Sequence, residues 1–511
     1  MDRSVEADRP LQILLAAAEV APFAKTGGLG DVCGALPQAL AERGHQVAVM
    51  MPLFHSCRTA GIPIEPLDLM VEAPVQGRSE YCRLWRGLMP NSQVPIYFLE
   101  HNLYYDRDDA RAGHTIYQYK GADGHQRDYE DNLARFTFFC RAVLNSCHVL
   151  NYWPDILHVN DWHTGLIPVY LRTLYNWDVK FRRMKSLLTI HNMAYQGRFA
   201  KEQLGVTGLD WGLFKYEYLE YLDMINLLKG GIVFADAVNA VSRRYADEIA
   251  TYEGGYGLDP VIRNHWYKVT GIMNGVDYSV WNPATDRYLP VHYQPDNAHW
   301  GKARCKEHLQ RISSLPVRHD VPVLGLVSRL VKQKGIELIQ GCAWDLMNHD
   351  VQLVVVGTGE PAYEGFLRHL ANTFPHKVAV ALEFSESLAH QVVAGADMYL
   401  MPSLYEPSGL NQLYSLKYGT IPIVRFVGGL ADSVTDLSEG SLKQGIATGF
   451  AFNDYHPMAL LWAIRRAMDC YRQTPAIWAQ LQQNAMLQDW SWKRGAANYE
   501  TLYYKMLEVP S

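Results

Sequence analysis

A chain of 511 residues exceeds the range over which one hydrophobic core usually grows, so its length predicts two domains. Its 47 lysine and arginine residues against 53 aspartate and glutamate residues exclude a global attraction for nucleic acid or an anionic membrane. The eight cysteines form no CxxC pair, no apolar run approaches the roughly 20 residues of a membrane span, and the polar start lacks a signal-peptide core. We therefore expect a soluble protein of a reducing compartment, with no nucleic-acid or membrane partner.

Short apolar runs separated by helix-like stretches predict the strands of two parallel sheets. The first series of runs lies at 13–18, 46–50, 96–99, 156–159, 186–190 and 237–241. The second series lies at 323–327, 351–356, 378–382, 398–401 and 421–424. Continuous apolar runs of this kind indicate strands that helices cover on both faces. The sequence thus predicts an α/β fold with two doubly wound, Rossmann-like domains.

Turn-forming residues predict where the two domains meet. Asn274-Gly275 and Asn282-Pro283 favour turns, and a polar stretch with further prolines follows them. We expect the first domain to span residues 1–285 and the second to begin at residue 286.

The glycine-rich segment Lys25–Val32 follows the first predicted strand and precedes a helix-like stretch. Glycines at such a place let backbone N–H groups approach an anion, and Lys25 adds a positive charge. The segment is not a P-loop, because the lysine precedes the glycines and no G-K-[ST] follows. A nicotinamide site is disfavoured, because Cys33 replaces a fingerprint glycine and the second strand ends at Met50-Met51-Pro52 without an acidic residue. An anion site and a structural glycine turn both remain open.

Two segments of the second predicted domain also leave the ends of strands. Arg329 and Lys334 follow the run at 323–327, where ligands of open α/β sheets bind. Fixed cations there would stabilise the negative charge that develops on a departing diphosphate. Glu406 and the amides of Gly409 and Leu410 follow the run at 398–401 and could hold hydroxyl groups and phosphate. A solvated basic loop and a surface turn remain the alternatives.

Polar side chains gather at strand ends in the first predicted domain as well. Asp131-Asn132 is followed by Arg135-Phe136, while the segments 158–163 and 191–197 each place a histidine group where a strand closes. No HExxH motif or cysteine supports a metal site among them. Asp106-Arg107-Asp108 matches a metal-binding D-x-D pattern, but it lies among other charges and we interpret it as a solvated loop.

In this order, these segments resemble the ADP-glucose-dependent glycogen and starch synthases of bacteria and plastids over nearly the whole chain. Lys25–Val32 matches K-x-G-G-L-x-D-V, and Asp161–His163 matches D-W-H. The other matches are 191–197 to H-N-L-A-Y-Q-G, Asn274-Gly275 to the N-G hinge, 329–335 to R-L-x-x-Q-K-G, 406–410 to E-P-C-G-L, and 417–420 to K-Y-G-T.

The resemblance implies a retaining glucosyltransferase of GT-B architecture, with its active site in a cleft that the two domains face. Its partners would be ADP-glucose and the non-reducing end of an α-1,4-glucan or maltooligosaccharide, with no metal and no other cofactor. It places the second domain at 286–485, followed by a terminal helix at 486–511 that returns to the first domain, and it implies the bacterial cytoplasm or the plastid stroma. A UDP-glucose-using transferase of this architecture and a catalytically silent glucan-binding or initiation partner remain alternatives, and the sequence does not indicate the oligomeric state.

By the same resemblance, the catalytic residues are Lys25, His163, Arg329, Lys334 and Glu406. Arg329 and Lys334 would stabilise the leaving ADP, Glu406 would bind the donor sugar, and His163 would have a positioning and electrostatic role. The implied substrate-binding residues are Gly27, Gly28, Asp31, Asp131, Asn192, Asn274, Phe384, Ser408, Gly409, Leu410 and Tyr414.

Two of these substrate-binding positions carry residues that differ from a related pattern, one from the synthases themselves and one from other retaining transferases. Ser408 replaces the usual cysteine of E-P-C-G-L, which argues against an essential thiol there. Tyr414 stands where many related retaining transferases carry a second glutamate, although these synthases themselves have an aromatic residue. Phe384 falls near the aromatic residue on which the adenine stacks.

Overall fold

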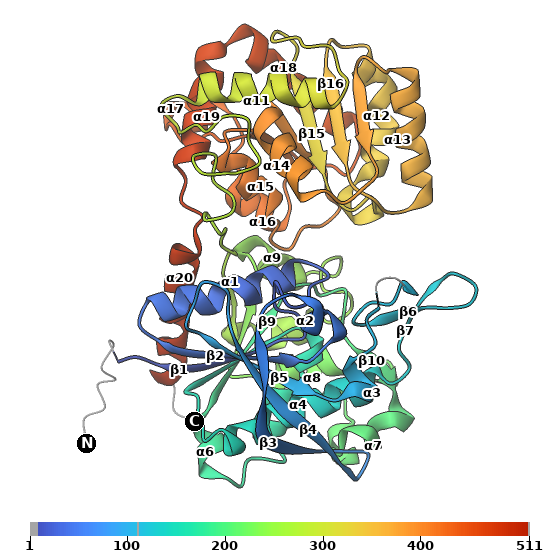
Figure 1. Cartoon of the computed structure of the whole chain (residues 1–511), viewed down its shortest axis with the longest axis vertical. Helices are drawn as coiled ribbons and strands as arrows, with labels where there is room; N and C mark the ends of the chain where they lie inside the picture. Colours follow the sequence, from blue (N-terminus) through green and yellow to red (C-terminus); the bar gives the residue numbers. More distant parts are fainter. Residues whose placement is uncertain (1–8, 110–111, 509–511) are drawn as a thin grey trace. The chain divides into compact units, whose positions relative to one another are not determined.

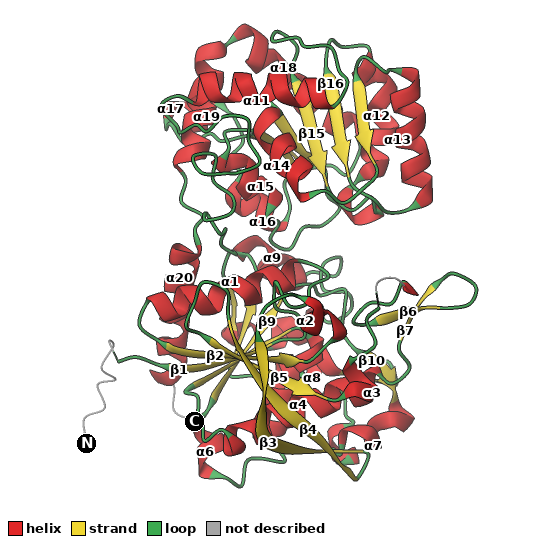
Figure 2. Cartoon of the chain, viewed as in Figure 1, coloured by secondary structure: helices red, strands yellow, loops and turns green. Residues whose placement is uncertain are grey.

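The computed structural model describes residues 9–109 and 112–508, which form two α/β units (Figure 1). The first unit contains residues 9–241, 246–275 and 492–508, and the second contains 242–245 and 276–491. Each unit has parallel strands with helices packed around them (Figure 2), so the predicted α/β fold with two Rossmann-like domains is confirmed. No helix in the described ranges is both long and apolar enough to cross a membrane.

Both junctions differ from the predicted boundaries at residues 285 and 485. The stretch 276–285 belongs to the second unit, because its Trp281 ring stacks on Tyr414 at a centroid distance of 3.9 Å and on His390 at 3.7 Å. The chain rejoins the first unit at Trp492 rather than at residue 486. A Cβ on Gly275 would lie 2.7 Å from the Trp492 Cα, so only glycine allows these two backbone segments to approach so closely.

The first unit is built on a nine-stranded sheet in the order β14-β13-β9-β8-β1-β2-β5-β4-β3. In chain order the strands are β1 (Gln12–Ala16), β2 (Gln46–Pro52), β3 (Ile64–Val75), β4 (Arg78–Leu88), β5 (Pro95–Glu100), β8 (Ile156–Asn160), β9 (Lys185–Ile190), β13 (Ala237–Ala240) and β14 (Val269–Gly271). Within this sheet the β3–β4 and β4–β5 pairings are antiparallel, and the other pairings are parallel. Strands β3 and β4 were not predicted from the sequence, because their buried and exposed residues alternate instead of forming one apolar run.

The helices of the first unit cover this sheet. They are α1 (Gly28–Glu42), α2 (His55–Thr59), α3 (Asn102–Tyr105), α4 (Asn132–Val149), α5 (Leu166–Arg172), α6 (Val179–Arg183), α7 (Leu204–Thr207), α8 (Leu227–Phe234), α10 (Asp259–Asn264) and α20 (Trp492–Glu508). Helix α9 (Arg243–Ile249) begins in the stretch assigned to the second unit and ends in the first. Helix α20 packs against α1, and its buried tyrosine hydroxyls fix it to the sheet. Tyr503 bonds the His158 Nδ1 at 2.8 Å, and Asn239 donates to the Tyr499 hydroxyl at 3.0 Å.

The second unit is built on six parallel strands in the order β17-β16-β15-β18-β19-β20. They are β15 (Val323–Val327), β16 (Gln352–Val356), β17 (Val378–Ala381), β18 (Met398–Met401), β19 (Ile421–Arg425) and β20 (Phe450–Phe452). Its helices are α11 (Ala298–Ile312), α12 (Ile336–Met347), α13 (Pro361–Thr373), α14 (Glu386–Gly395), α15 (Asn411–Lys417), α16 (Gly428–Ser433), α17 (Glu439–Lys443), α18 (Pro457–Gln473) and α19 (Pro475–Leu487). In each unit the strand order reverses beside the first strand, which is the doubly wound arrangement.

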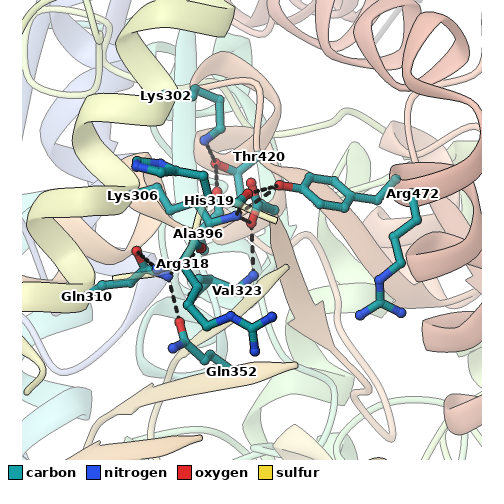
Figure 3. Close-up of polar contacts among 12 residues, drawn as sticks. Lys302, Lys306, Gln310, Arg318, His319, Val323, Gln352, Ala396, Thr420 and Arg472 are labelled. Atoms are coloured by element: carbon teal, nitrogen blue, oxygen red, sulfur yellow. Dashed lines mark hydrogen bonds and ion pairs between the residues drawn. The ribbon is translucent and has the colours of Figure 1, made fainter. Parts of the chain in front are cut away.

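A buried polar network anchors α11 at the amino ends of the second sheet (Figure 3). The Lys306 Nζ lies 2.7 Å from the Asp397 Oδ2, and both side chains are buried. The same carboxylate oxygen accepts the Val323 N–H at 2.8 Å. Lys302 donates to the Thr420 hydroxyl at 2.6 Å, and burial lowers the pKa of Lys302 to about 8. The amino edge of this sheet is therefore closed by charges that have fixed partners.

We expect Lys306→Met to lower the free energy of unfolding of the second unit by about 3–5 kcal/mol, because it leaves the buried Asp397 carboxylate without its cation. Denaturant titration measures this loss. Lys443→Met is the matched control, since it breaks an exposed ion pair with Glu439 and such pairs contribute little to stability. Equal, small losses from the two substitutions would show that the buried pair does not hold α11 in place.

Candidate active site

The loops that carry the predicted site residues of the first unit leave adjacent strands. Strands β1, β8 and β9 are neighbours and parallel, so their carboxyl ends lie at one edge of the sheet. The strand order reverses between β1 and β8, and ligands of doubly wound sheets bind outside such a switch point. The sheet therefore brings together the segments of Lys25, His163 and Asn192.

The glycine loop after β1 leaves open space at the start of α1. A Cβ on Gly27 or Gly28 would meet no atom within 4 Å, so a ligand can approach the backbone there. The N–H groups of Gly28 and Leu29 have no acceptor among the described residues, as is usual in the first turn of a helix. Lys25 is exposed, and its Nζ lies 2.6 Å from the Asp31 Oδ1. An amide pair and a mobile ammonium group at a helix N-terminus suit an anion.

His163 lies in the short 3-10 helix η2 (Trp162–Thr164) and is buried. Its ring stacks on Tyr117 at a centroid distance of 4.6 Å and meets the edge of Phe136 at 4.8 Å. Burial holds the pKa of His163 well below its ordinary value, so the ring is neutral at physiological pH. Its Nδ1 has no hydrogen-bond partner in the described part of the chain. The ring can therefore give or accept one hydrogen bond without first breaking another.

Asp161 joins the loops that follow β8 and β9. Its backbone has φ +55°, and its carboxylate accepts the His191 N–H at 2.7 Å. Burial raises the pKa of Asp161 to about 7. The His191 ring bonds the Asn160 side chain at 2.9 Å, and Asn192 is half-buried and caps its own turn through the Ala194 N–H. The sequence motifs around these residues thus serve mainly to fix the two loops together.

Three further residues of the first unit that the sequence analysis considered as site residues are paired with other side chains or buried. Asp131 forms two hydrogen bonds with the Arg107 guanidinium, at 2.5 and 3.0 Å. Asn274 is buried, and its Oδ1 lacks a partner within the described ranges. The interpretation of Asp108 as part of a solvated loop is wrong, because its buried carboxylate accepts the N–H groups of His55 and Ser56 at the start of α2.

In the second unit, the loops after β15 and β18 flank the corresponding switch point. Lys334 closes the 3-10 helix η6 (Lys332–Lys334), and its Nζ lies 2.7 Å from the Glu406 Oε2. Ser403 donates to the same carboxylate oxygen at 3.0 Å, so Glu406 is fixed from two sides. Gly335 has φ +70°, and a Cβ there would meet the Pro402 carbonyl at 2.0 Å. The two loops therefore pack directly on each other, and the structure brings Lys334 and Glu406 together.

Arg329 lies in the same loop as Lys334 and is exposed. It forms no ion pair with any other described residue, whereas Lys334 is held by Glu406. The edge of the second sheet thus presents two cations. The Lys334 ammonium is held in place by Glu406, and the Arg329 guanidinium has no carboxylate partner among the described residues. Such a pair can bind a diphosphate without an energetic cost for separating the guanidinium from an existing partner.

The loop that contains Ser408, Gly409 and Leu410 precedes α15. It is supported by Gly428 and Gly429, which follow β19 and begin α16. A Cβ on Gly428 would lie 2.0 Å from the Glu406 carbonyl oxygen, and one on Gly429 would lie 1.9 Å from that of Ser408. These glycines let α16 pack against the backbone that holds Glu406. In the sequence, the only sign of this supporting role was the Gly-Gly pair that follows the predicted strand at 421–424.

The two predicted aromatic positions of the second unit differ in accessibility. One face of the Tyr414 ring is covered by Trp281, with an interplanar angle of 2°. Phe384 is 92% exposed and follows β17 at the same sheet edge. Phe384 thus offers a free ring face for stacking, while Tyr414 is already packed within the unit.

Comparisons with known proteins agree with this arrangement. The family model of the starch synthase catalytic domain matches residues 12–264, and that of group 1 glycosyl transferases matches residues 310–484. The glycogen synthase of Anaeromyxobacter sp. (strain Fw109-5) is 44% identical over 493 residues, which cover 96% of this chain and 99% of that protein. The glycogen synthase of Syntrophotalea carbinolica is 41% identical over 499 residues, with 98% and 99% covered.

Among solved structures, the catalytic domain of starch synthase IV from Arabidopsis thaliana, bound to ADP and acarbose, has a TM-score of 0.86. It is 30% identical, and the match covers 98% of this chain and all of that one. Sucrose-phosphate synthase from Thermosynechococcus elongatus is 18% identical with a TM-score of 0.57, and it shares the fold. Identity above 40% over nearly the full length of both proteins settles the family. The chain belongs to the glycogen and starch synthases and is a glycosyltransferase of the GT-B fold.

Proposed function

We propose that this enzyme transfers glucose from ADP-glucose to the non-reducing end of an α-1,4-glucan with retention of the anomeric configuration. The observation that carries the proposal is the pairing of Lys334 with Glu406 at the carboxyl edge of the second sheet, in the same loop as Arg329, which forms no ion pair with a described residue. The Arabidopsis relative with ADP and acarbose bound supports a nucleotide and a saccharide as ligands. All five residues with implied catalytic roles are present, which argues against a silent binding partner.

In the proposed reaction, the bond between the anomeric carbon and the diphosphate oxygen breaks, and its electron pair stays on ADP. The terminal 4-hydroxyl oxygen of the glucan forms a bond to the same face of that carbon, and the hydroxyl proton passes to the departing phosphate oxygen. Lys334 and Arg329 stabilise that charge as it develops, because they are in place before the bond breaks. Glu406 accepts hydrogen bonds from the donor sugar and orients the Lys334 ammonium. Lys25 and the free amides of α1 supply a second anion-binding group, and the neutral His163 ring positions the sugar.

The compartment remains the one expected from the sequence. All eight cysteines are free and buried, which fits the reducing environment of the bacterial cytoplasm or the plastid stroma. We infer that the enzyme works in one of these compartments.

We expect ADP-glucose to be strongly preferred over UDP-glucose. Transfer of radiolabelled glucose from each donor to maltooligosaccharides, at matched concentrations, measures the preference. Equal or faster transfer from UDP-glucose would contradict the proposed nucleotide while leaving the glucan synthase assignment intact.

We also propose that transfer needs no divalent metal, because Lys25, Arg329 and Lys334 supply the positive charge near the diphosphate. Protein treated with EDTA is expected to keep its full rate of transfer from ADP-glucose. A loss of rate that added manganese or magnesium restores would overturn this proposal.

Lys334→Ala is expected to lower kcat by about 100-fold or more, because it removes one donor to the developing charge on ADP. Lys332→Ala is the matched control. Lys332 has the same charge, lies two positions away in the same η6 turn and is exposed, but no ion pair joins its ammonium group to a described carboxylate.

The comparison of these two variants distinguishes a binding site from a generic basic loop. A large loss for Lys334→Ala with a small one for Lys332→Ala supports the proposed role. Similar small losses, with folding verified by thermal melts, would show that the loop does not stabilise the leaving group.

A further inference from the structure

We propose that Glu19 is a positioning residue that holds the glycine loop of Lys25 and the ring of His163 in one fixed arrangement. This inference rests on the proposed function. Glu19 follows β1, and its side chain is buried, with 4% of the residue exposed. Within the described residues, no hydrogen bond or ion pair joins its carboxylate to any of the side chains proposed above for catalysis. Any effect on the reaction therefore passes through the groups that Glu19 holds.

The Glu19 carboxylate accepts four hydrogen bonds, which fill both of its oxygens. Oε2 accepts the N–H groups of Thr26 at 2.5 Å and Gly27 at 3.2 Å. Oε1 accepts the hydroxyl groups of Thr26 at 2.8 Å and Tyr117 at 2.8 Å. No Lys, Arg or His forms an ion pair with Glu19 in the described part of the chain, so this buried charge depends on those four donors.

The first pair of bonds fixes the start of α1. Thr26 and Gly27 are the residues between Lys25 and the first helical residue, Gly28. The N–H groups of Thr26 and Gly27 donate to Glu19 and are therefore not free to bind a ligand. The next two N–H groups, those of Gly28 and Leu29, have no acceptor among the described residues and can bind one. Glu19 therefore selects which amides face the anion and where the Lys25 backbone lies.

The second contact fixes the histidine. Tyr117 donates to Glu19 at one end and stacks on the His163 ring along its face, with an interplanar angle of 22°. The Tyr117 carbonyl accepts from the Asn132 amide at 3.2 Å, and the buried Arg135 donates to the preceding carbonyl at 2.9 Å, so α4 holds this tyrosine from the other side. Burial raises the pKa of Tyr117 well above its ordinary value, so its hydroxyl stays protonated and remains a donor.

Anion binding by itself does not explain why Glu19 is a carboxylate. A negative charge next to an anion-binding helix N-terminus opposes the anion, and a neutral side chain would favour ADP electrostatically. Its presence is explained if two amides and two hydroxyl donors must be held at once, because both oxygens of a carboxylate only accept hydrogen bonds. Glutamine can keep its oxygen on the two amides, but its NH2 group then faces the Thr26 and Tyr117 hydroxyls and reverses the direction of both bonds.

The test compares Glu19→Gln, Tyr117→Phe and a control, Asp236→Asn. Asp236 is a carboxylate of the same unit that accepts the N–H and hydroxyl of Ser186 and pairs with Arg172, at the amino edge of the sheet and away from the loops of the site. Like Glu19, it accepts both an N–H and a hydroxyl group, although it also pairs with Arg172, and it has no expected role in transfer.

Glu19→Gln is expected to lower kcat by about 10- to 100-fold, because a displacement of about 1 Å in a site can cost that much. Its dissociation constant for ADP, measured by calorimetry, should change much less than kcat. Tyr117→Phe leaves the bonds to Thr26 and Gly27 in place, so it should lower kcat and leave ADP binding unchanged. Asp236→Asn should lower the melting temperature and leave kcat of the folded enzyme unchanged.

Hydrogen exchange gives a readout that does not depend on activity. Glu19→Gln should speed exchange in the segment 26–30, while Asp236→Asn should leave that segment unchanged. Unaltered exchange there, or a kcat within twofold of the parent in an active enzyme, would overturn the role of Glu19. A parent protein that transfers no glucose from ADP-glucose, with the exchange difference still present, would instead contradict the proposed function alone.

Discussion

The direction of the strands decides where the loops of the proposed site lie. The second sheet is parallel throughout, and the first is parallel from β14 to β5, so the loops that leave the carboxyl ends of these strands open at one edge of each sheet. The strand order reverses beside β1 in the first unit and beside β15 in the second, and a reversal leaves room between the two diverging loops. Lys25 and His163 occupy the first switch point, and Lys334 and Glu406 occupy the second.

The two edges of each sheet are built differently. At the amino edge of the second sheet, Lys306 and Asp397 are buried and fully paired, which favours stability. At the carboxyl edges, two polar groups lack a partner among the described residues: the His163 Nδ1, which is buried, and the Arg329 guanidinium, which is exposed and forms no ion pair. An exposed group without an ion-pair partner is available to a ligand, whereas a buried one without a hydrogen bond lowers stability. The loops of the site are fixed by other residues, as Glu406 is by Ser403.

Much of the fold could be predicted from the sequence, because buried parallel strands are continuous apolar runs. The strands β3 and β4 could not, since an alternating pattern is weak in a charged segment, and the junction near residue 276 depends on Trp281 packing within the second unit. The site residues were found through short motifs. Glu19 has no motif, because its role depends on Tyr117, which lies about a hundred positions away in the chain and is brought close only by folding.

The central claim is that the carboxyl edge of the second sheet holds the diphosphate of the nucleotide. A crystal structure of the protein with ADP tests it most directly. The account predicts phosphate oxygens within hydrogen-bonding distance, about 3 Å, of the Lys334 Nζ and the Arg329 guanidinium. A well-ordered ADP whose phosphates contact neither residue would contradict it.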